Sequence, residues 1–223
     1  ALIPKNGIEE IAKQLKSQLT KTTFKFSSRV KKINNNDIML ENGETLNTDF
    51  IIIATEASQL IENLKCQEIN WKSCQNLYFT TDKRIFKKPF IGLIPNNKSL
   101  INNIFYPSSI ESKFRGEKDL LSVSIIKEHN YSKNKLIDVV KKELQEICKI
   151  ENISFLKLYN LPKALPHLKN LKYELAPSET KLKDGIFLAG DLLLNGSLNA
   201  AMIAGEKAAY GILEVLEKIN NKQ

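Results

Sequence analysis

The feature that most constrains the fold is a pair of short, uninterrupted apolar segments. Residues 49–55 read Asp-Phe-Ile-Ile-Ile-Ala-Thr, and residues 185–191 read Gly-Ile-Phe-Leu-Ala-Gly-Asp. Apolar runs that do not alternate with polar residues are typical of parallel strands buried on both faces. We therefore predict that both segments are strands of one sheet, as parallel neighbours or near neighbours. The first is expected to be a central strand that is covered on both faces.

The residues after the second segment predict a loop and then a helix from about 197 to 218. Small residues recur at helical spacing along it, at 200, 201, 204, 205, 208 and 209. Asp191 ends the strand, where its carboxylate can accept a hydrogen bond from a polyol or ribose hydroxyl. The N–H groups at a helix start favour an electron-rich or anionic group, and flavin dinucleotides offer both. The alternative is an ordinary strand-loop-helix unit whose small residues serve packing alone.

The same stretch carries a recognisable spacing. It is set by Gly190, Asp191, Gly196, Ser197, Ala200, Ala201, Gly205, Ala208 and Ala209. This pattern resembles the C-terminal FAD signature of the flavin amine oxidase superfamily, which also holds protoporphyrinogen oxidases, renalase-like proteins and phytoene desaturases. The resemblance implies an FAD-dependent oxidoreductase.

Two further segments extend the resemblance. Residues 29–33, Gly43, Asp49 and 52–55 are similar to a family pattern in which the residue at Val30 offers its backbone to adenine. Residues 159–168 are similar to a segment that lines the flavin or substrate cavity, which implies that Ala164, Leu165 and Pro166 lie there. Taken alone, Val30 is equally a buried strand residue, and 161–166 is equally a plain loop between domains.

The resemblance implies a set of residues for the cofactor. These are Val30, Ala54, Thr55, Gly190, Asp191, Gly196, Ser197, Leu198, Asn199 and Ala200. In this interpretation the backbone N–H groups of Leu198 and Asn199 stabilise negative charge, and Asp191 holds the ribityl or pyrophosphate region. No catalytic base can be named from the sequence.

One element of the family pattern is missing from this sequence. Relatives begin with a GxGxxG strand-turn-helix and an acidic residue about twenty positions later. The nine glycines here are dispersed, and none forms that motif. We therefore expect the chain to be the C-terminal part of a longer flavoprotein that binds FAD weakly or not at all by itself. The alternative is a complete and unrelated α+β protein.

The order of elements predicts an interrupted domain. Residues 1–64 are expected to be part of an FAD-binding domain, 65–160 a β-rich substrate domain, and 161–223 a return to the first domain. The predicted class is α/β overall, Rossmann-like, with α+β character in the insert. Helices are expected at 7–19 and 133–147, in addition to the C-terminal one. Strands are expected at 24–26, 29–33, 37–40, 44–46, 49–55, 76–81, 88–93, 100–106, 120–127, 155–159 and 186–189.

Composition excludes several functions. The net charge is +8, but only three of the 33 basic residues are arginine and no long basic run occurs, so nucleic-acid binding is not expected. The cysteines, Cys66, Cys74 and Cys148, form no CxxC pair, and no metal site is visible. No run approaches the roughly 18 apolar residues of a membrane span. A cytoplasmic bacterial protein is expected, with peripheral membrane association left open.

The reaction is predicted only at the level of its class. In the middle of the chain, the residues at 76–79, 89–91, 101–104, 107–109 and 121–124 resemble those of desaturase-like proteins from cyanobacteria and plastids. Relatives that oxidise amines often carry an aromatic residue where this chain has Ser197. That departure argues against an amine and leaves polyene or other apolar small molecules open. We expect oxidation or desaturation of an organic substrate by hydride transfer to flavin. The alternative is a non-catalytic binding or scaffold domain that retains the fold.

Overall fold

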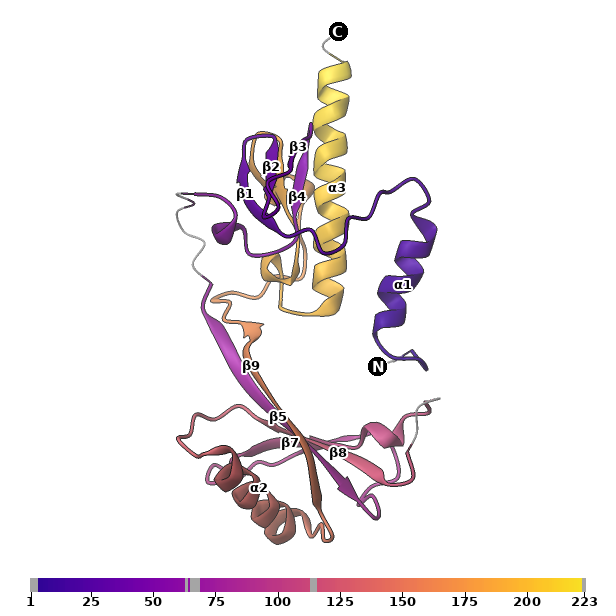
Figure 1. Cartoon of the computed structure of the whole chain (residues 1–223), viewed down its shortest axis with the longest axis vertical. Helices are drawn as coiled ribbons and strands as arrows, with labels where there is room; N and C mark the ends of the chain where they lie inside the picture. Colours follow the sequence, from indigo (N-terminus) through magenta and orange to yellow (C-terminus); the bar gives the residue numbers. More distant parts are fainter. Residues whose placement is uncertain (1–3, 63, 65–68, 113–115, 222–223) are drawn as a thin grey trace. The chain divides into compact units, whose positions relative to one another are not determined.

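The computed structural model describes residues 4–62, 64, 69–112 and 116–221, which are drawn as coloured ribbon in Figure 1. The chain divides into two compact units. Unit 1 contains residues 1–23 and 72–164, and unit 2 contains residues 24–71 and 165–223. The chain therefore passes from one unit to the other three times.

Unit 1 is built on a five-stranded sheet in the order β6-β7-β8-β5-β9. Its strands are β5 (Trp71–Thr81), β6 (Ile91–Leu93), β7 (Ile101–Phe105), β8 (Asp119–Ile125) and β9 (Ser154–Pro166). The pairs β5–β8, β6–β7 and β7–β8 are antiparallel. A short 3-10 helix, η2 (Pro107–Ser109), follows β7.

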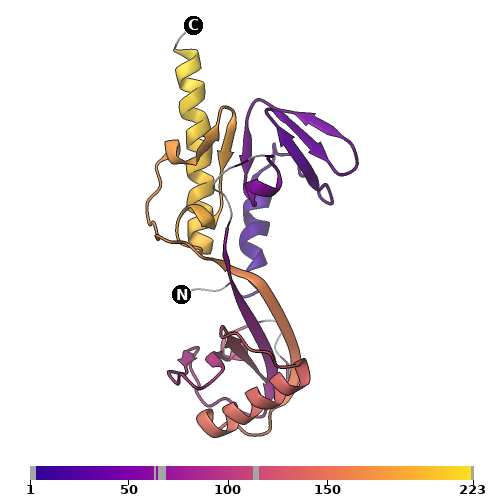
Figure 2. The same ribbon diagram turned by 90° about the vertical axis from the view of Figure 1, so that its left-hand side faces the viewer.

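One face of this sheet is covered by α2 (Lys133–Cys148), which confirms the helix predicted at 133–147 (Figure 2). Its apolar positions Leu136, Val140 and Leu144 recur at helical spacing and are fully buried. The Ser132 side chain caps the start of the helix by accepting the Lys135 N–H at 3.4 Å. Lys149 ends the helix in the left-handed region, with φ of 55°.

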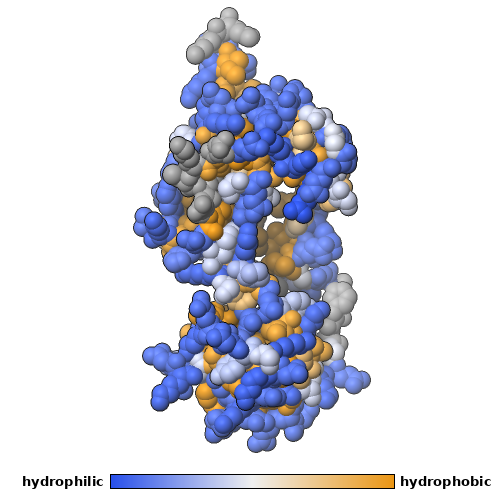
Figure 3. Space-filling model, turned by 60° about the vertical axis from the view of Figure 1, so that its left-hand side comes forward, coloured by the Kyte–Doolittle hydropathy of each residue, from blue (hydrophilic) through white to orange (hydrophobic). Residues whose placement is uncertain are grey.

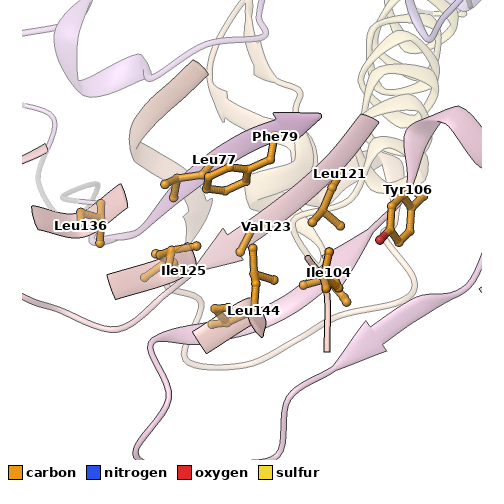
Figure 4. Close-up of a cluster of buried hydrophobic side chains, with 12 residues drawn as sticks. Leu77, Phe79, Ile104, Tyr106, Leu121, Val123, Ile125, Leu136 and Leu144 are labelled. Carbon is orange, nitrogen blue, oxygen red and sulfur yellow. The ribbon is translucent and has the colours of Figure 1, made fainter. Parts of the chain in front are cut away.

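The core of unit 1 is a single cluster of twelve buried residues from α2, β5, β7, β8 and the segments beside them (Figure 4). Large aliphatic and aromatic side chains fill it, and none exceeds 2% exposure. Register explains the pattern, because Leu77 pairs with Val123 and Phe79 with Leu121. Alternate residues of each strand thus point to the helix-covered face.

Unit 2 contains two three-stranded sheets. The first is an antiparallel meander of β1 (Val30–Asn34), β2 (Asp37–Leu40) and β3 (Thr45–Asn47). The second has the order β10-β11-β4 and comprises β4 (Ile51–Ile53), β10 (Lys181–Lys183) and β11 (Ile186–Leu188). In it β4 and β11 are parallel, with Ile51 opposite Ile186 and Ile53 opposite Leu188. The prediction that the two apolar segments are parallel neighbours is therefore confirmed.

Within unit 2, one face of this second sheet packs against the meander, and the other face packs at β11 against α3. On one face Ile51, Ile53 and Ile186 pack against Ile33 of the meander. On the other face Phe187 packs against α3 (Leu198–Asn220), the helix predicted at 197–218. The contact is close, because a Cβ on Gly211 of α3 would lie 2.9 Å from both the Phe187 ring and the Pro177 carbonyl oxygen. Small residues therefore let α3 approach the sheet.

The position of β4 differs from the prediction of a central strand. The Ile51 N–H donates to the Gly185 carbonyl at 2.8 Å, and the Ala189 N–H donates to the Ile53 carbonyl at 2.9 Å. Since alternate residues of a parallel strand bond to opposite sides, the Ile52 N–H and C=O point away from β11. Among the described residues β4 is an outer strand, and the Ile52 side chain is 41% exposed.

Other predicted elements were wrong in part. Residues 24–26 form no strand; instead the Phe24 and Phe26 rings stack with centroids 6.1 Å apart. The expected loop at 161–166 is the last part of β9, and β10 was not anticipated. The predicted first helix is present as α1 (Glu9–Gln18), and none of its side chains is buried.

Apolar areas interrupt the hydrophilic surface of both units (Figure 3).

Candidate functional site

The candidate site lies in unit 2, where β4 and β11 end side by side. Ala54 and Thr55 follow β4 and are exposed, whereas Gly190 and Asp191 follow β11 and are half-buried. Because β4 and β11 are parallel, their carboxyl ends meet at one edge of the sheet. Ligands of open α/β sheets bind in the crevice outside this edge. Four of the residues predicted for the cofactor therefore lie at the position where such folds bind ligands.

Gly190 has a backbone conformation that few other residues adopt. Its φ is 119° and its ψ is 165°, a region that is accessible essentially only to glycine. A Cβ built on this residue would find no atom within 4 Å. The Gly190 turn therefore has open space directly above its backbone, which is the arrangement that lets a ligand approach the main chain.

The loop after Gly190 is held by its own backbone. Asp191 begins a short 3-10 helix, η4 (Asp191–Leu193), and its carbonyl oxygen accepts the N–H groups of Leu194 at 3.2 Å and Gly196 at 3.1 Å. These bonds fix the Asp191 main chain without the help of its carboxylate. The side chain is half-buried at the strand end.

Ser197 caps the start of α3. Its hydroxyl accepts the Ala200 N–H at 3.1 Å and donates to the Asn195 side-chain oxygen at 2.7 Å. The Asn195 amide in turn donates to the Lys172 carbonyl at 3.2 Å. The serine hydroxyl thus holds the start of α3 in place. That Ser197 also belongs to the cofactor set, as the resemblance implies, stays a prediction. The N–H groups of Leu198 and Asn199 lie in the first turn, where no carbonyl of an earlier turn can accept them.

Gly196, which belongs to the predicted cofactor set, lies beside the residues that were predicted to line a cavity. Its φ is 69°, and a Cβ there would lie 3.3 Å from Pro166 and 3.8 Å from the Leu165 side chain. Leu165 and Pro166, which were predicted for a cavity, therefore border the loop that carries the FAD-like signature. Ala164 is half-buried and belongs to unit 1.

Val30 lies elsewhere in unit 2. It begins β1 opposite Leu40 and packs, half-buried, beside the cluster that contains Ile33 and Ile51. The cavity described next does not include it among its lining residues.

A cavity of about 430 Å³ opens at the same strand ends. Its lining is Thr55, Ala57, Ile69, Asn70, His167, Leu168, Lys169, Leu188, Ala189, Leu192 and Leu193. Of these, only Thr55 had been predicted as a site residue. Asn70 is placed there because its carbonyl accepts the His167 N–H at 2.7 Å. Sequence reasoning named neither His167 nor Lys169 as a site residue, although His167 lies within the segment 159–168 that was predicted to line a cavity and Lys169 follows that segment directly.

The described cysteines are poor candidates for a nucleophile. Burial raises the pKa of the Cys74 and Cys148 thiols above the usual range, which keeps them protonated at neutral pH. Cys66 lies outside the described residues. Across the described part of the chain, no group of three histidine, cysteine, aspartate or glutamate residues can hold a metal ion.

The chain has the fold of the C-terminal portion of a two-domain FAD-dependent oxidoreductase. The chain belongs to the family of flavin containing amine oxidoreductases, whose model matches residues 1–213. No curated protein matches the chain.

Several solved structures have a similar fold. A putative protoporphyrinogen oxidase from Exiguobacterium sp. 255-15 is 14% identical with a TM-score of 0.65, over 97% of this chain and 51% of that one. An oxidoreductase from Methanosarcina mazei is 15% identical with a TM-score of 0.62, over 95% and 54%. Putrescine oxidase bound to putrescine is 11% identical with a TM-score of 0.64, over 93% and 53%. The chain thus spans about half the length of these structures, and at such identities the likeness concerns the fold alone.

Proposed function

We propose that this chain is the C-terminal part of an FAD-dependent oxidoreductase that oxidises or desaturates an organic small molecule. One observation carries the proposal: the Gly190 turn, the Asp191 carboxylate and the Ser197-capped start of α3 all lie at the carboxyl ends of two parallel strands. This arrangement supplies an open backbone approach, a hydrogen-bond acceptor and a positive helix end at one edge of the sheet.

The residues present fit one side of a flavin dinucleotide. The open space above Gly190 admits a ligand against the backbone, and the half-buried Asp191 carboxylate suits a hydroxyl of a ribityl chain. When bound, FAD supplies the acceptor for a hydride from the substrate. Asp191 would orient the cofactor, while the Leu198 and Asn199 N–H groups would stabilise negative charge close to the start of α3. Val30, Ala54, Thr55, Gly196, Ser197 and Ala200 complete the proposed cofactor-binding set.

The finer assignments are part of the same proposal. The enzyme is desaturase-like and similar to those of cyanobacteria and plastids. Its substrate is an apolar small molecule that contacts residues 164–166. Its location is cytoplasmic, with peripheral membrane association as an open alternative. The domain division at 64 and 160 also belongs here. Among the described residues, no helix has both the length and the apolar character needed to cross a membrane.

A scaffold that retains the fold without flavin is the competing proposal. FAD titration distinguishes the flavoenzyme from the scaffold. Two proteins are titrated: the 223-residue chain, and the natural gene product if it extends upstream with a glycine-rich loop. Absorbance at the flavin bands reports binding. We expect the chain alone to stay nearly colourless, because losing several charge-assisted hydrogen bonds of about 1.5–3 kcal/mol each removes most of the affinity. We expect the longer protein to be yellow.

The same titration can contradict the proposal in two ways. A colourless longer protein that contains the glycine-rich loop would favour the scaffold. Stoichiometric FAD in the 223-residue chain would show that the binding determinants are wrongly placed.

A further inference from the structure

Residues 83–98 of unit 1 form a surface segment that is both apolar and basic. The segment comprises the loop after β5, the edge strand β6 and the turn that follows β6. Large apolar side chains of this segment are between 45% and 71% exposed, namely those of Ile85, Phe90, Ile91 and Leu93. Single exposed apolar residues are normal on a protein surface, whereas a group of them close together marks an interaction site.

The core of unit 1 does not take up these side chains, because their neighbours already occupy the inward positions. The half-buried Phe86 packs against the core cluster. Gly92 lies against Ile104, since a Cβ on Gly92 would lie 3.0 Å from that side chain. Successive residues of a strand point to opposite faces, so Ile91 and Leu93 on either side of Gly92 face outward. The fold therefore keeps these apolar side chains exposed.

Two of the exposed residues also border a cavity. Ile85 and Leu93 line a space of about 550 Å³ together with Ile147 at the end of α2. Apart from Asn96, the described lining residues carry no nitrogen or oxygen in their side chains. Such a cavity accommodates part of a hydrocarbon chain and offers no group that would hold a charged ligand.

The charge of the segment has one sign. Its sequence contains no aspartate or glutamate. Its basic residues are Lys83, Arg84, Lys87, Lys88 and Lys98. The Arg84 Nε lies 3.4 Å from the Asp119 carboxylate, which neutralises this one guanidinium. The four lysines are exposed, and none of them forms an ion pair with a carboxylate in the described part of the chain.

Carboxylates on the elements beside the segment have partners of their own. Glu143 of α2 accepts the Ser99 hydroxyl at 2.6 Å and the Leu100 N–H at 3.0 Å. Glu146, also on α2, pairs with Lys142 at 3.7 Å. These carboxylates are therefore engaged elsewhere, and the positive charge of the segment faces solvent.

We propose that residues 83–98 dock unit 1 onto an anionic lipid surface. The lysines contact the negative head groups, while the exposed apolar side chains enter the boundary between head groups and acyl chains. Interfacial binding strengthens with both the apolar area that is buried and the attraction to anionic lipid, and this segment supplies both. A second copy of the chain fits less well, because its own segment carries the same positive charge.

This proposal does not rest on the flavin. The segment lies in unit 1, and it shares no residue with the proposed cofactor-binding set, which lies in unit 2. It gives the peripheral membrane association that was left open a defined surface and a lipid class.

Co-sedimentation of the 223-residue chain with vesicles tests the proposal. One set of vesicles contains phosphatidylcholine alone, and the other contains phosphatidylcholine mixed with phosphatidylglycerol. We expect at least tenfold stronger partition into the mixed vesicles, and added salt should weaken it because part of the attraction is electrostatic.

A pair of lysine substitutions tests the charge. The double variant Lys87→Gln, Lys88→Gln should weaken partition about thirtyfold, since each lysine near an anionic surface is worth about 1 kcal/mol. The matched control is the double variant Lys133→Gln, Lys135→Gln, which loses the same charge at the start of α2, the opposite end of this helix from Ile147. This control should change partition less than threefold.

A second pair of substitutions tests the apolar contact. Leu93→Ser should weaken partition at least tenfold. Leu156→Ser is its control, because Leu156 is 59% exposed on β9, at the opposite edge of the sheet from β6. Since all the replaced side chains are exposed, the melting temperatures should match that of the parent chain.

Four outcomes would overturn the proposal. They are equal partition into the two kinds of vesicle, equal effects of the two lysine pairs, equal effects of Leu93→Ser and Leu156→Ser, and self-association without vesicles that Leu93→Ser abolishes. The last outcome, measured by sedimentation equilibrium, would assign the surface to a second copy of the chain instead.

Discussion

The two units of this chain are held together in opposite ways. Unit 1 has one cluster of twelve buried residues, among them Phe79 and Leu121, which fill the space between the sheet and α2. The described part of unit 2 instead has three smaller clusters, in which Ala200, Ala204 and Ala208 bring α3 close to its neighbours. Unit 1 is thus stabilised by the volume of its side chains, whereas in unit 2 the packing of α3 depends on close approach of the backbone.

This difference indicates which kind of substitution, a smaller or a larger side chain, each unit tolerates. Removing atoms from a filled core leaves a cavity, whereas adding atoms to a tight contact forces the backbone apart. The candidate site lies in unit 2, on the loop between β11 and α3. Since that loop depends on close approach, its geometry is expected to be more sensitive to added volume than to removed volume.

The largest effect is expected from Phe79→Ala. Phe79 is fully buried in unit 1, so its truncation should lower the stability of that unit by about 3–5 kcal/mol. Hydrogen exchange measured by mass spectrometry should show faster exchange in α2 but not in α3. Ile91→Ala is the control, because Ile91 is 65% exposed. Equal loss of protection in α3 would show that the two units unfold as one.

Asp191→Ala tests whether the site is separate from the core of unit 2. In the longer protein it should weaken flavin binding by about 1.5–3 kcal/mol, roughly ten- to a hundredfold, through one lost charge-assisted hydrogen bond. The melting temperature of the apoprotein should stay nearly unchanged, because the Asp191 main chain is held by its own carbonyl bonds. A matching loss of apoprotein stability would instead indicate a purely structural carboxylate.

Gly211→Ala tests close approach in unit 2. The added methyl group would lie 2.9 Å from a backbone oxygen and from the Phe187 ring, so we expect a loss of about 1–3 kcal/mol. Gly205→Ala is the matched control on the same helix, since its Cβ would meet nothing within 4 Å. This control should stabilise α3 by up to about 1 kcal/mol. Similar denaturation midpoints for the two variants would contradict the packing described for α3.

The smallest of the expected effects is a loss of stability in unit 2 at low pH. In unit 2, Lys172 lowers the pKa of Glu179, Lys25 that of Glu44, and Lys181 that of Asp184, each mainly through a side-chain hydrogen bond. A lowered carboxyl pKa stabilises the fold above the usual value, 4.5 for Glu179, and this contribution is lost as the pH falls through the folded value.

The measurement is the melting temperature of each unit between pH 6 and pH 3. Unit 2 should lose stability on acidification, Glu179→Gln should reduce that loss, and added salt should do the same because these pairs are exposed. In unit 1, Lys13 has a raised pKa, mainly through its hydrogen bond to Glu10, so the stability that its protonation contributes is lost as the pH rises through the folded value. A pH profile of unit 2 that Glu179→Gln leaves unchanged would refute this account.

The sequence predicted the parts of the fold that local patterns encode. The uninterrupted Ile51–Ile53 run and its counterpart at 186–188 predicted a parallel pair, and Ser197 marked the start of α3. The family and the fold class followed from the spacing after Gly190.

The missed parts depend on tertiary context. Pro162 and Pro166 indicated a loop, but β9 lies at the edge of its sheet, where missing N–H groups are tolerated. The three residues of β10 are too few to show a periodicity, and they become a strand only by pairing with β11. His167 and Lys169 reach the cavity because β9 ends beside Asn70, which no local pattern reveals.

The open edge of β4 has a consequence for handling the protein in solution. A strand whose N–H and C=O groups face outward is a template on which a second polypeptide can add by main-chain pairing. The apolar Ile52 side chain beside it gives such pairing no electrostatic barrier. The purified chain should therefore aggregate more readily as its concentration rises. A lysine in place of Ile52 is the kind of change by which natural proteins commonly suppress edge-to-edge aggregation.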